Sequence, residues 1–232
     1  METDFVKKKR AGTIIRILAK SYPDAKIALR YKDPFQLLVV TILSAQSTDK
    51  QINKISPALF AKFKTVKGFA GANIKEFERY VHSTGFYHNK AKNIKAMAQK
   101  LLAEFNGKVP QTMEELVSLP GVARKTANIV LSNGFGIIVG IAVDTHVKRL
   151  SQRLGFSKQE DPTKIEQDLM DIFPKKIWGK INHLLIHHGR TVCDANKPKC
   201  LECPVRDLCP SYKMFVKTPR WGVSSKICWT LE

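Results

Sequence analysis

Four cysteines near residue 200 constrain this chain more than any other feature. Cys193, Cys200, Cys203 and Cys209 follow the spacing C-x6-C-x2-C-x5-C within seventeen residues. A loop this short cannot bury a hydrophobic core, so a metal centre is its natural organiser. Four thiolates suit a zinc ion or a [4Fe–4S] cluster, and the single C-x2-C pair favours the cluster without deciding the matter. Cys228 lies apart and is predicted to be a free thiol.

Elsewhere, apolar residues recur at helical spacing, which predicts an all-α fold. Ile165, Leu169 and Ile172 are one example. Proline and glycine punctuate these segments and are expected to separate helices. The one β-rich stretch, residues 136–143, is bracketed by glycines. We interpret it as an apolar connection that leads to Asp144.

Charge narrows the class of partner. The chain carries 39 Lys and Arg against 20 Asp and Glu, a formal net charge of +19. Such an excess suits nucleic acid, whose condensed counterions are released on binding. A membrane surface is the rival partner, but no basic amphipathic helix with bulky apolar anchors supports it. The longest strongly apolar run, residues 35–45, is too short to span a bilayer and predicts a buried helix.

The most informative stretch is residues 116–131, LVSLPGVARKTANIVL. One helix is expected to end near Leu119, and the next to begin near Val122 after a tight turn at Pro120 and Gly121. The glycine allows unusual backbone angles and close approach of another chain. The start of the second helix offers backbone N–H groups and a positive dipole end, which suit a phosphate without sequence preference.

Several segments together resemble the endonuclease III family of DNA glycosylases. They are LSAQSTD (43–49), TGFY (84–87), LPGVARKTA (119–127), VDTHV (143–147), HGR (188–190) and the cysteine loop. The similarity covers roughly residues 10–210.

The resemblance implies a two-domain helix–hairpin–helix glycosylase fold with DNA and the active site in the groove between the domains. One domain would be a six-helix barrel, residues 27–136, and the other an iron–sulfur cluster domain, residues 1–26 and 137–210. The four cysteines would hold a [4Fe–4S] cluster. Residues 211–232 would form a C-terminal tail with no assigned role.

By the same resemblance, Lys125 is the nucleophile that attacks C1′ of the damaged nucleotide and displaces the base. The resulting amine forms a Schiff base, which permits β-elimination of the 3′ phosphate. A protonated amine cannot attack, and the usual lysine pKa is about 10.4. The helix dipole, the neighbouring Arg124 and desolvation in a closed cleft are each expected to favour the neutral amine. Without the motif, Lys125 would read as an ordinary surface lysine.

Asp144 resembles the catalytic carboxylate of the family, which would stabilise the cationic sugar and help to move protons. It also reads as a helix N-cap, and one side chain can serve both roles. One extra residue lies between Lys125 and Asp144 compared with the family pattern. His146 is expected either to line the pocket or contact the DNA backbone, or to be a buried structural histidine.

A damaged base must leave the stack before a lysine can reach C1′, and another group must fill the gap. The resemblance implies Gln46 and Phe86 for this wedge, although helical periodicity alone would place Phe86 in the core. The family commonly has leucine at this position and glycine at that of Ala123. A bulky apolar wedge is kept at Phe86, and Ala123 requires ordinary backbone angles.

Further DNA contacts are expected at the hairpin and on the cysteine loop. Gly121, Ala123 and Arg124 belong to the hairpin site. Lys197 and Lys199 lie between the first two cysteines, on a loop that a metal would pin at both ends. They would form a rigid basic prong for DNA phosphates. Simple solvation of a surface loop is an equally good interpretation of these two lysines.

The sequence therefore predicts a bifunctional base-excision enzyme that removes oxidised pyrimidines through a lysine Schiff base. Its partner would be double-stranded DNA with damaged bases or abasic sites, and it would act as a monomer in the cytoplasm, at the nucleoid, without a membrane segment or secretion signal. One alternative is a monofunctional mismatch glycosylase of the same superfamily, which would normally lack the lysine. The other is a non-catalytic helix–hairpin–helix module, which would need neither Lys125 nor Asp144.

Overall fold

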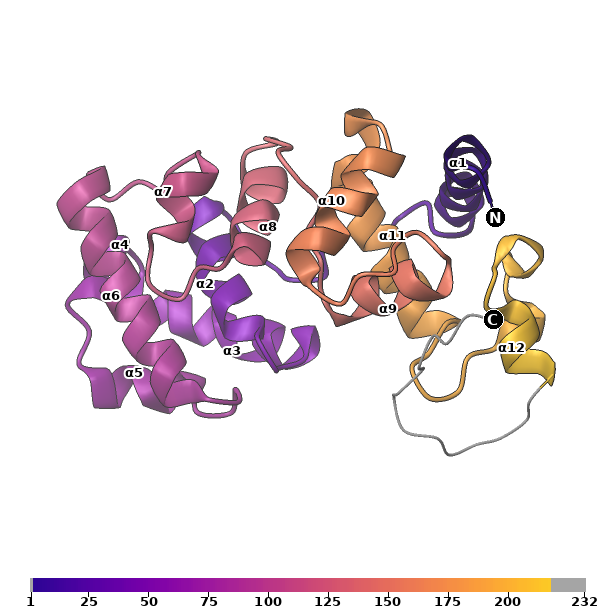
Figure 1. The fold of residues 1–232 in the computed structure, drawn as a ribbon. Coiled ribbons are helices and arrows are strands. Elements are labelled where there is room, and N and C mark those ends of the chain that lie inside the picture. Colours follow the sequence, from indigo (N-terminus) through magenta and orange to yellow (C-terminus); the bar gives the residue numbers. More distant parts are fainter. Residues whose placement is uncertain (1, 218–232) are drawn as a thin grey trace. The chain divides into compact units, whose positions relative to one another are not determined.

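The computed structural model describes residues 2–217 of the 232-residue chain. This part consists of helices and connections without a strand, which confirms the all-α prediction. Residues 136–143 form an irregular connection, as expected. The chain divides into two compact units, each of which has its own core (Figure 1).

The first unit, here called the hairpin unit, contains Lys26–Ala142 and Lys175–Lys180. It extends beyond the boundary expected at residue 136, because Ile137 packs against its core. Its helices are α2 (Pro34–Ser44), α3 (Asp49–Phe63), α4 (Val66–Ala70), α5 (Ile74–Val81), α6 (Tyr87–Phe105), α7 (Met113–Val117) and α8 (Arg124–Gly134), and Lys175–Ile177 is a 3-10 turn. Thus seven α-helices are present where six were expected. Two of the seven, α4 and α7, have only five residues each.

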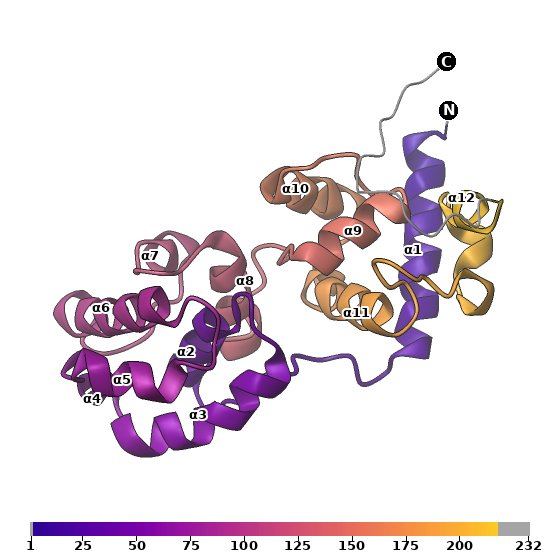
Figure 2. The same cartoon turned by 90° about the horizontal axis from the view of Figure 1, so that it is seen from below.

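Helix α2 is the buried centre of the hairpin unit. It begins where the Asp33 carboxylate accepts the Gln36 N–H at 2.8 Å, with Pro34 at the first position. Residues 37–43 are all buried, as the long apolar run predicts. Helices α3, α6 and α8 pack against α2, and α6 also packs along α4 and α5 (Figure 2). No helix within residues 2–217 is both long and apolar enough to cross a membrane.

The second unit, the cysteine unit, contains the described residues of Met1–Ala25, Val143–Pro174 and Ile181–Glu232. Its elements are α1 (Asp4–Ser21), α9 (Thr145–Arg153), α10 (Pro162–Ile172), most of α11 (Trp178–Thr191), two 3-10 turns (Cys200–Glu202 and Arg206–Leu208) and α12 (Tyr212–Lys217). Buried side chains from α1, α9, α10 and α11 form its core.

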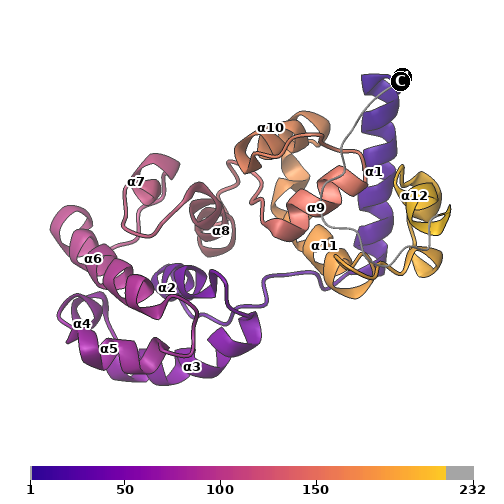
Figure 3. The same ribbon diagram turned by 60° about the horizontal axis from the view of Figure 1, so that its bottom comes forward.

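The cysteine loop is hydrogen-bonded to helix α1, which comes from the start of the chain. Figure 3 shows α1 beside the loop that leads into α12, and Arg10 on α1 makes the connection. Its guanidinium donates to the carbonyls of Leu154 at 2.7 Å and Leu208 at 3.3 Å. The start of the chain therefore holds the segment next to the last of the four clustered cysteines. Of the predicted tail, residues 211–217 include helix α12, whereas Cys228 and residues 218–232 lie outside the described chain.

Candidate functional site

The predicted hairpin is present, but its helices end further apart than expected. Helix α7 ends at Val117 and α8 begins at Arg124, because residues 119–122 form a turn in which the Val122 N–H donates to the Leu119 carbonyl at 3.1 Å. Gly121 has a φ of +78°, which disfavours any residue with a side chain. A Cβ at this position would lie 2.9 Å from the Cβ of Asn93 on α6. Both the backbone angle and the close neighbour therefore require glycine.

Ala123 is the N-cap of α8 and has ordinary extended angles, φ −91° and ψ 166°. This confirms that the departure from glycine is tolerated here. Its methyl group offers no acceptor to the first N–H groups of the helix, unlike the usual Ser, Thr, Asp or Asn cap. Arg124 and Lys125 follow in the first turn, and the side chains of both are exposed.

Asp144 is the N-cap of α9 in the cysteine unit. One carboxylate oxygen, Oδ1, accepts the Val147 N–H at 2.8 Å, so the predicted capping role is confirmed. The other oxygen, Oδ2, lies 3.5 Å from Nδ1 of His146. His146 is neither fully buried nor fully open, since 28% of its side chain is exposed. The cap fixes the carboxylate rotamer and leaves one oxygen directed at the imidazole.

Gln46 and Phe86 lie in two short segments of the hairpin unit that share an unusual backbone. Both residues are left-handed, with φ of 53° and 56°. Both side chains are exposed, and Phe86 is 66% exposed. The periodicity-based interpretation of Phe86 as a core residue is therefore wrong, because the left-handed turn before α6 directs this ring into solvent. The two segments meet where the Gly85 N–H donates to Ser47 Oγ at 3.2 Å.

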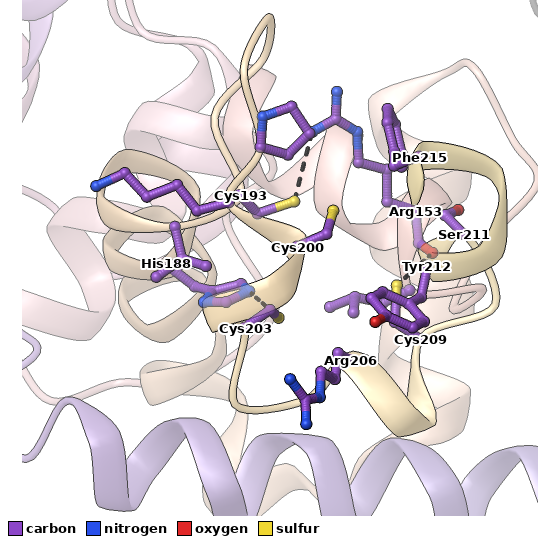
Figure 4. A pocket seen from close by; sticks show the side chains of 14 residues that line it. Arg153, His188, Cys193, Cys200, Cys203, Arg206, Cys209, Ser211, Tyr212 and Phe215 are labelled. Carbon is purple, nitrogen blue, oxygen red and sulfur yellow. Dashed lines mark hydrogen bonds between the residues drawn. The ribbon is translucent and has the colours of Figure 1, made fainter. Parts of the chain in front are cut away.

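All four clustered cysteines line one cavity of the cysteine unit, and their sulfurs face a common space (Figure 4). The cavity has about 360 Å³ of empty space, part of which is open to solvent. Within the described chain all four are free cysteines. No group of three or more His, Cys, Asp or Glu among residues 2–217 is arranged to hold a metal ion.

Two residues to which the sequence analysis assigned no role, Arg153 and His188, contact the cysteine sulfurs. Arg153, at the end of α9, donates to Cys193 Sγ at 3.4 Å and to the Asp194 carbonyl at 2.6 Å. His188 on α11 places Nε2 3.6 Å from Cys203 Sγ, and its Nδ1 lies 3.0 Å from the Tyr22 hydroxyl. Neither contact has a sequence signal, because each depends on how the helices pack around the loop.

Burial shapes the titration of the groups in this cavity. It raises the pKa of the Cys200 and Cys203 thiols above the usual value, and that of Cys209 to about 11. It lowers the pKa of the His188 imidazole to about 4. Loss of water disfavours the charged form in every case. The thiols are therefore held neutral unless a bound cation compensates for the charge of the thiolates.

The two loop lysines, Lys197 and Lys199, have exposed side chains. The turn before them is ordered by Asp194, whose carboxylate accepts the N–H groups of Asn196 at 2.8 Å and Lys197 at 3.1 Å. The Lys199 N–H donates to the Val192 carbonyl at 2.9 Å. The loop therefore has a defined backbone, and its basic side chains point into solvent.

Comparisons with known proteins agree on one relationship. Residues 39–175 match the model of the HhH-GPD superfamily base excision DNA repair proteins. Endonuclease III of Synechocystis sp. is 55% identical over 205 residues, which is 88% of this chain and 94% of that protein. Endonuclease III of Bacillus subtilis is 42% identical and covers 81% of this chain and 86% of its own length. A solved structure of a trapped endonuclease III–DNA covalent intermediate superposes with a TM-score of 0.87 at 41% identity, covering 90% of this chain and 98% of that one.

The hairpin geometry predicts that Gly121→Ala destabilises the protein more than Gly136→Ala. Both glycines have positive φ, but a Cβ at Gly136 would meet nothing within 4 Å. Each variant is expected to lose about 1–2 kcal/mol through backbone strain. The Gly121 variant should lose about 1–3 kcal/mol more, through overlap with Asn93. Urea unfolding measures both losses, and equal losses would contradict the close approach of Asn93.

Proposed function

This chain belongs to the endonuclease III family of the HhH-GPD base excision DNA repair proteins, and from that premise we propose how its residues carry out the reaction. The enzyme is a DNA glycosylase with lyase activity. We propose that it removes oxidised pyrimidines from duplex DNA and then cleaves the strand at the abasic site. The observation that carries the proposal is an exposed lysine, Lys125, in the first turn of the helix that follows the hairpin. We also propose that it acts in the cytoplasm at the nucleoid, where duplex DNA is its substrate.

Lys125 supplies the nucleophile in this proposal. Its neutral Nζ forms a bond to C1′ as the glycosidic bond breaks and the electron pair leaves with the base. The aminated sugar opens to a Schiff base. Loss of a proton from C2′ then expels the 3′ phosphate by β-elimination. The Lys125 side chain is exposed in the DNA-free protein and is therefore accessible to the sugar of bound DNA.

Asp144 supplies the negative charge opposite the developing cation on the sugar. Its Oδ1 is committed to the cap of α9, so Oδ2, beside His146, is the oxygen that acts on the sugar. A carboxylate held by a helix start keeps its orientation without reorganisation, which is what electrostatic stabilisation of a transition state requires. The His146 imidazole lies 3.5 Å from the same oxygen and helps to orient it.

Contacts with DNA away from the reacting sugar are assigned by position and exposure. Gln46 and Phe86 enter the stack and fill the gap that the extruded nucleotide leaves, since both present exposed side chains from left-handed turns. The hairpin turn at Gly121 and the start of α8 bind backbone phosphates through N–H groups and Arg124. The exposed Lys197 and Lys199 contact phosphates from the cysteine loop.

We propose that the four cysteines hold a [4Fe–4S] cluster, which is larger than the single metal ion for which no group among residues 2–217 is arranged. The four free thiols line one cavity. Four thiolates are the usual ligands of such a cluster. Cys193, Cys200, Cys203 and Cys209 would hold it, and the bound metal would keep the thiols deprotonated despite burial. Arg153 would donate to one ligand sulfur and partly balance the negative charge. The chemistry that the cluster supplies is a covalent link between distant parts of the loop.

The nucleophile is tested by borohydride trapping on duplex DNA that contains thymine glycol or an abasic site. Wild-type protein should form a covalent adduct with the DNA, and Lys125→Gln should form none, because the Schiff-base nitrogen is absent. Lys75→Gln is the matched control, since Lys75 is also an exposed lysine in the first turn of a helix of the hairpin unit. An adduct that persists in Lys125→Gln would assign the nucleophile elsewhere.

For the carboxylate, Asp144→Asn separates charge from capping. Asparagine can still accept the Val147 N–H, so the melting temperature should change little. The single-turnover excision rate should fall by about 10²- to 10⁴-fold, because the sugar cation loses its counter-charge. Asp161→Asn at the N-cap of α10 is the control, and its excision rate should match wild type. Equal rates for both variants would show that Asp144 only caps α9.

Metal content tests the cofactor. Purified protein should contain about four irons and visible absorbance from the cluster. Cys209→Ser should lose iron, whereas Cys228→Ser should keep it, because Cys228 stands outside the C-x6-C-x2-C-x5-C spacing. About one zinc per chain in place of iron would refute the cluster assignment and support the zinc alternative.

A further inference from the structure

Lys90 is a buried charged residue that the proposed chemistry does not use. It lies in the first turn of α6 and is only 6% exposed, in contrast to the exposed Lys125. Burial lowers the pKa of its amine to about 8. Burying an ammonium is unfavourable unless specific partners receive its protons. The contacts of Lys90 therefore need to be identified.

The amine of Lys90 binds the end of a different helix. Its Nζ donates to the Leu43 carbonyl at 2.7 Å. Leu43 is the penultimate residue of α2, where the last carbonyls lack partners within the helix and the dipole favours a positive charge. Lys90 thus caps α2 from α6. The segment that carries Gln46 begins at this end of α2.

A second contact of the same amine reaches the other segment through one hydroxyl group. Nζ also donates to Ser47 Oγ at 3.2 Å, and Ser47 Oγ accepts the Gly85 N–H at 3.2 Å. Gly85 directly precedes Phe86. The backbone of Lys90 adds a further contact, because its N–H donates to the Phe86 carbonyl at 3.2 Å. Lys90 is therefore hydrogen-bonded both to the segment that carries Gln46 and to the segment that carries Phe86.

Gln46 and Phe86 stand on either side of this network, each in a left-handed conformation. Such angles are strained for residues with side chains and persist only where the surroundings hold them. A Cβ on Gly85 would lie 3.2 Å from the Gln46 carbonyl oxygen, so the two backbones approach each other closely. The network thus holds two strained, exposed residues at a fixed spacing.

We propose that Lys90 is a positioning residue for lesion opening, which through Leu43 and Ser47 holds Gln46 and Phe86 in the geometry needed to enter the DNA stack. This inference rests on the proposed function of the two residues as a wedge. Lys90 itself is buried and touches neither DNA nor the reacting sugar. A wedge at fixed spacing lowers the cost of filling the gap, because its ordering precedes DNA binding.

The test compares Lys90→Met with Lys95→Met on two substrates. Methionine keeps an unbranched apolar stem and removes the ammonium. Lys95 is a matched control on the same helix, because its Nζ donates to the Ala72 carbonyl at 2.8 Å, away from both segments. One substrate carries thymine glycol in a paired duplex, and the other carries the same lesion in an unpaired bubble.

In the paired duplex, Lys90→Met should slow single-turnover excision by about 10- to 100-fold, as expected for a misplaced functional group. In the bubble the loss should shrink to about threefold or less, because the base is already unstacked. The fluorescence change of 2-aminopurine placed next to the lesion should weaken in the paired duplex only. Lys95→Met should match wild type in all three measurements.

Equal losses on both substrates, or no loss on either, would overturn the inference. Ser47→Ala removes the hydroxyl that joins Lys90 to Gly85 and leaves the bond from Lys90 to Leu43 intact, so it should show the same substrate-dependent loss, with a smaller size. It carries the test if Lys90→Met does not fold. Failure of wild-type protein to form the borohydride adduct would instead overturn the proposed function, so the two failures are distinguishable.

Discussion

The chemistry proposed for this chain depends on where two helices begin. The first turn of α8 presents Lys125, and the N-cap of α9 is Asp144. A helix start has N–H groups without partners inside the helix, and the two starts satisfy this constraint differently. In α9 the carboxylate itself accepts an N–H and is thereby oriented. In α8 the cap is an alanine, which offers no acceptor. The start of α9 is capped by the Asp144 side chain, whereas the start of α8 has no side-chain cap and is suited to an anionic ligand.

Charge in this protein is divided between accessible and inaccessible sites. A net charge of +19 sets a general attraction for polyanions, and exposed residues such as Arg124 and Lys197 are of this kind. Lys90 differs, because its side chain is buried and the Leu43 carbonyl and the Ser47 hydroxyl accept its protons. Salt screens exposed charges far more than buried ones. The buried ammonium of Lys90 therefore keeps its contacts under ionic conditions that weaken the surface attraction.

Much of the fold could be predicted from the sequence, because the responsible signals are local. Helical periodicity, the turn at Gly121 and the cysteine spacing were each visible without coordinates. Helix α7 ends, and α8 begins, about two residues away from the predicted positions, because a turn with its own hydrogen bond separates the two helices. Phe86 is exposed although the helical periodicity of its segment predicted burial, because a left-handed turn precedes α6. Lys90 and His188 could not be found, since their roles arise from contacts across 47 and 15 residues of sequence.

The two units differ in how many separate segments of the chain form them. Nearly all of the hairpin unit is one continuous segment, Lys26–Ala142, whereas the cysteine unit combines three separate segments, and its cavity is lined by residues as late as Phe215. During synthesis a domain generally folds once its residues have emerged from the ribosome. The hairpin unit can therefore acquire most of its core while the cysteines are still untranslated. Helix α1 precedes the hairpin unit in the sequence, but its packing partner α10 follows that unit. The [4Fe–4S] cluster proposed for the four cysteines would therefore be loaded only after the hairpin unit has been synthesised.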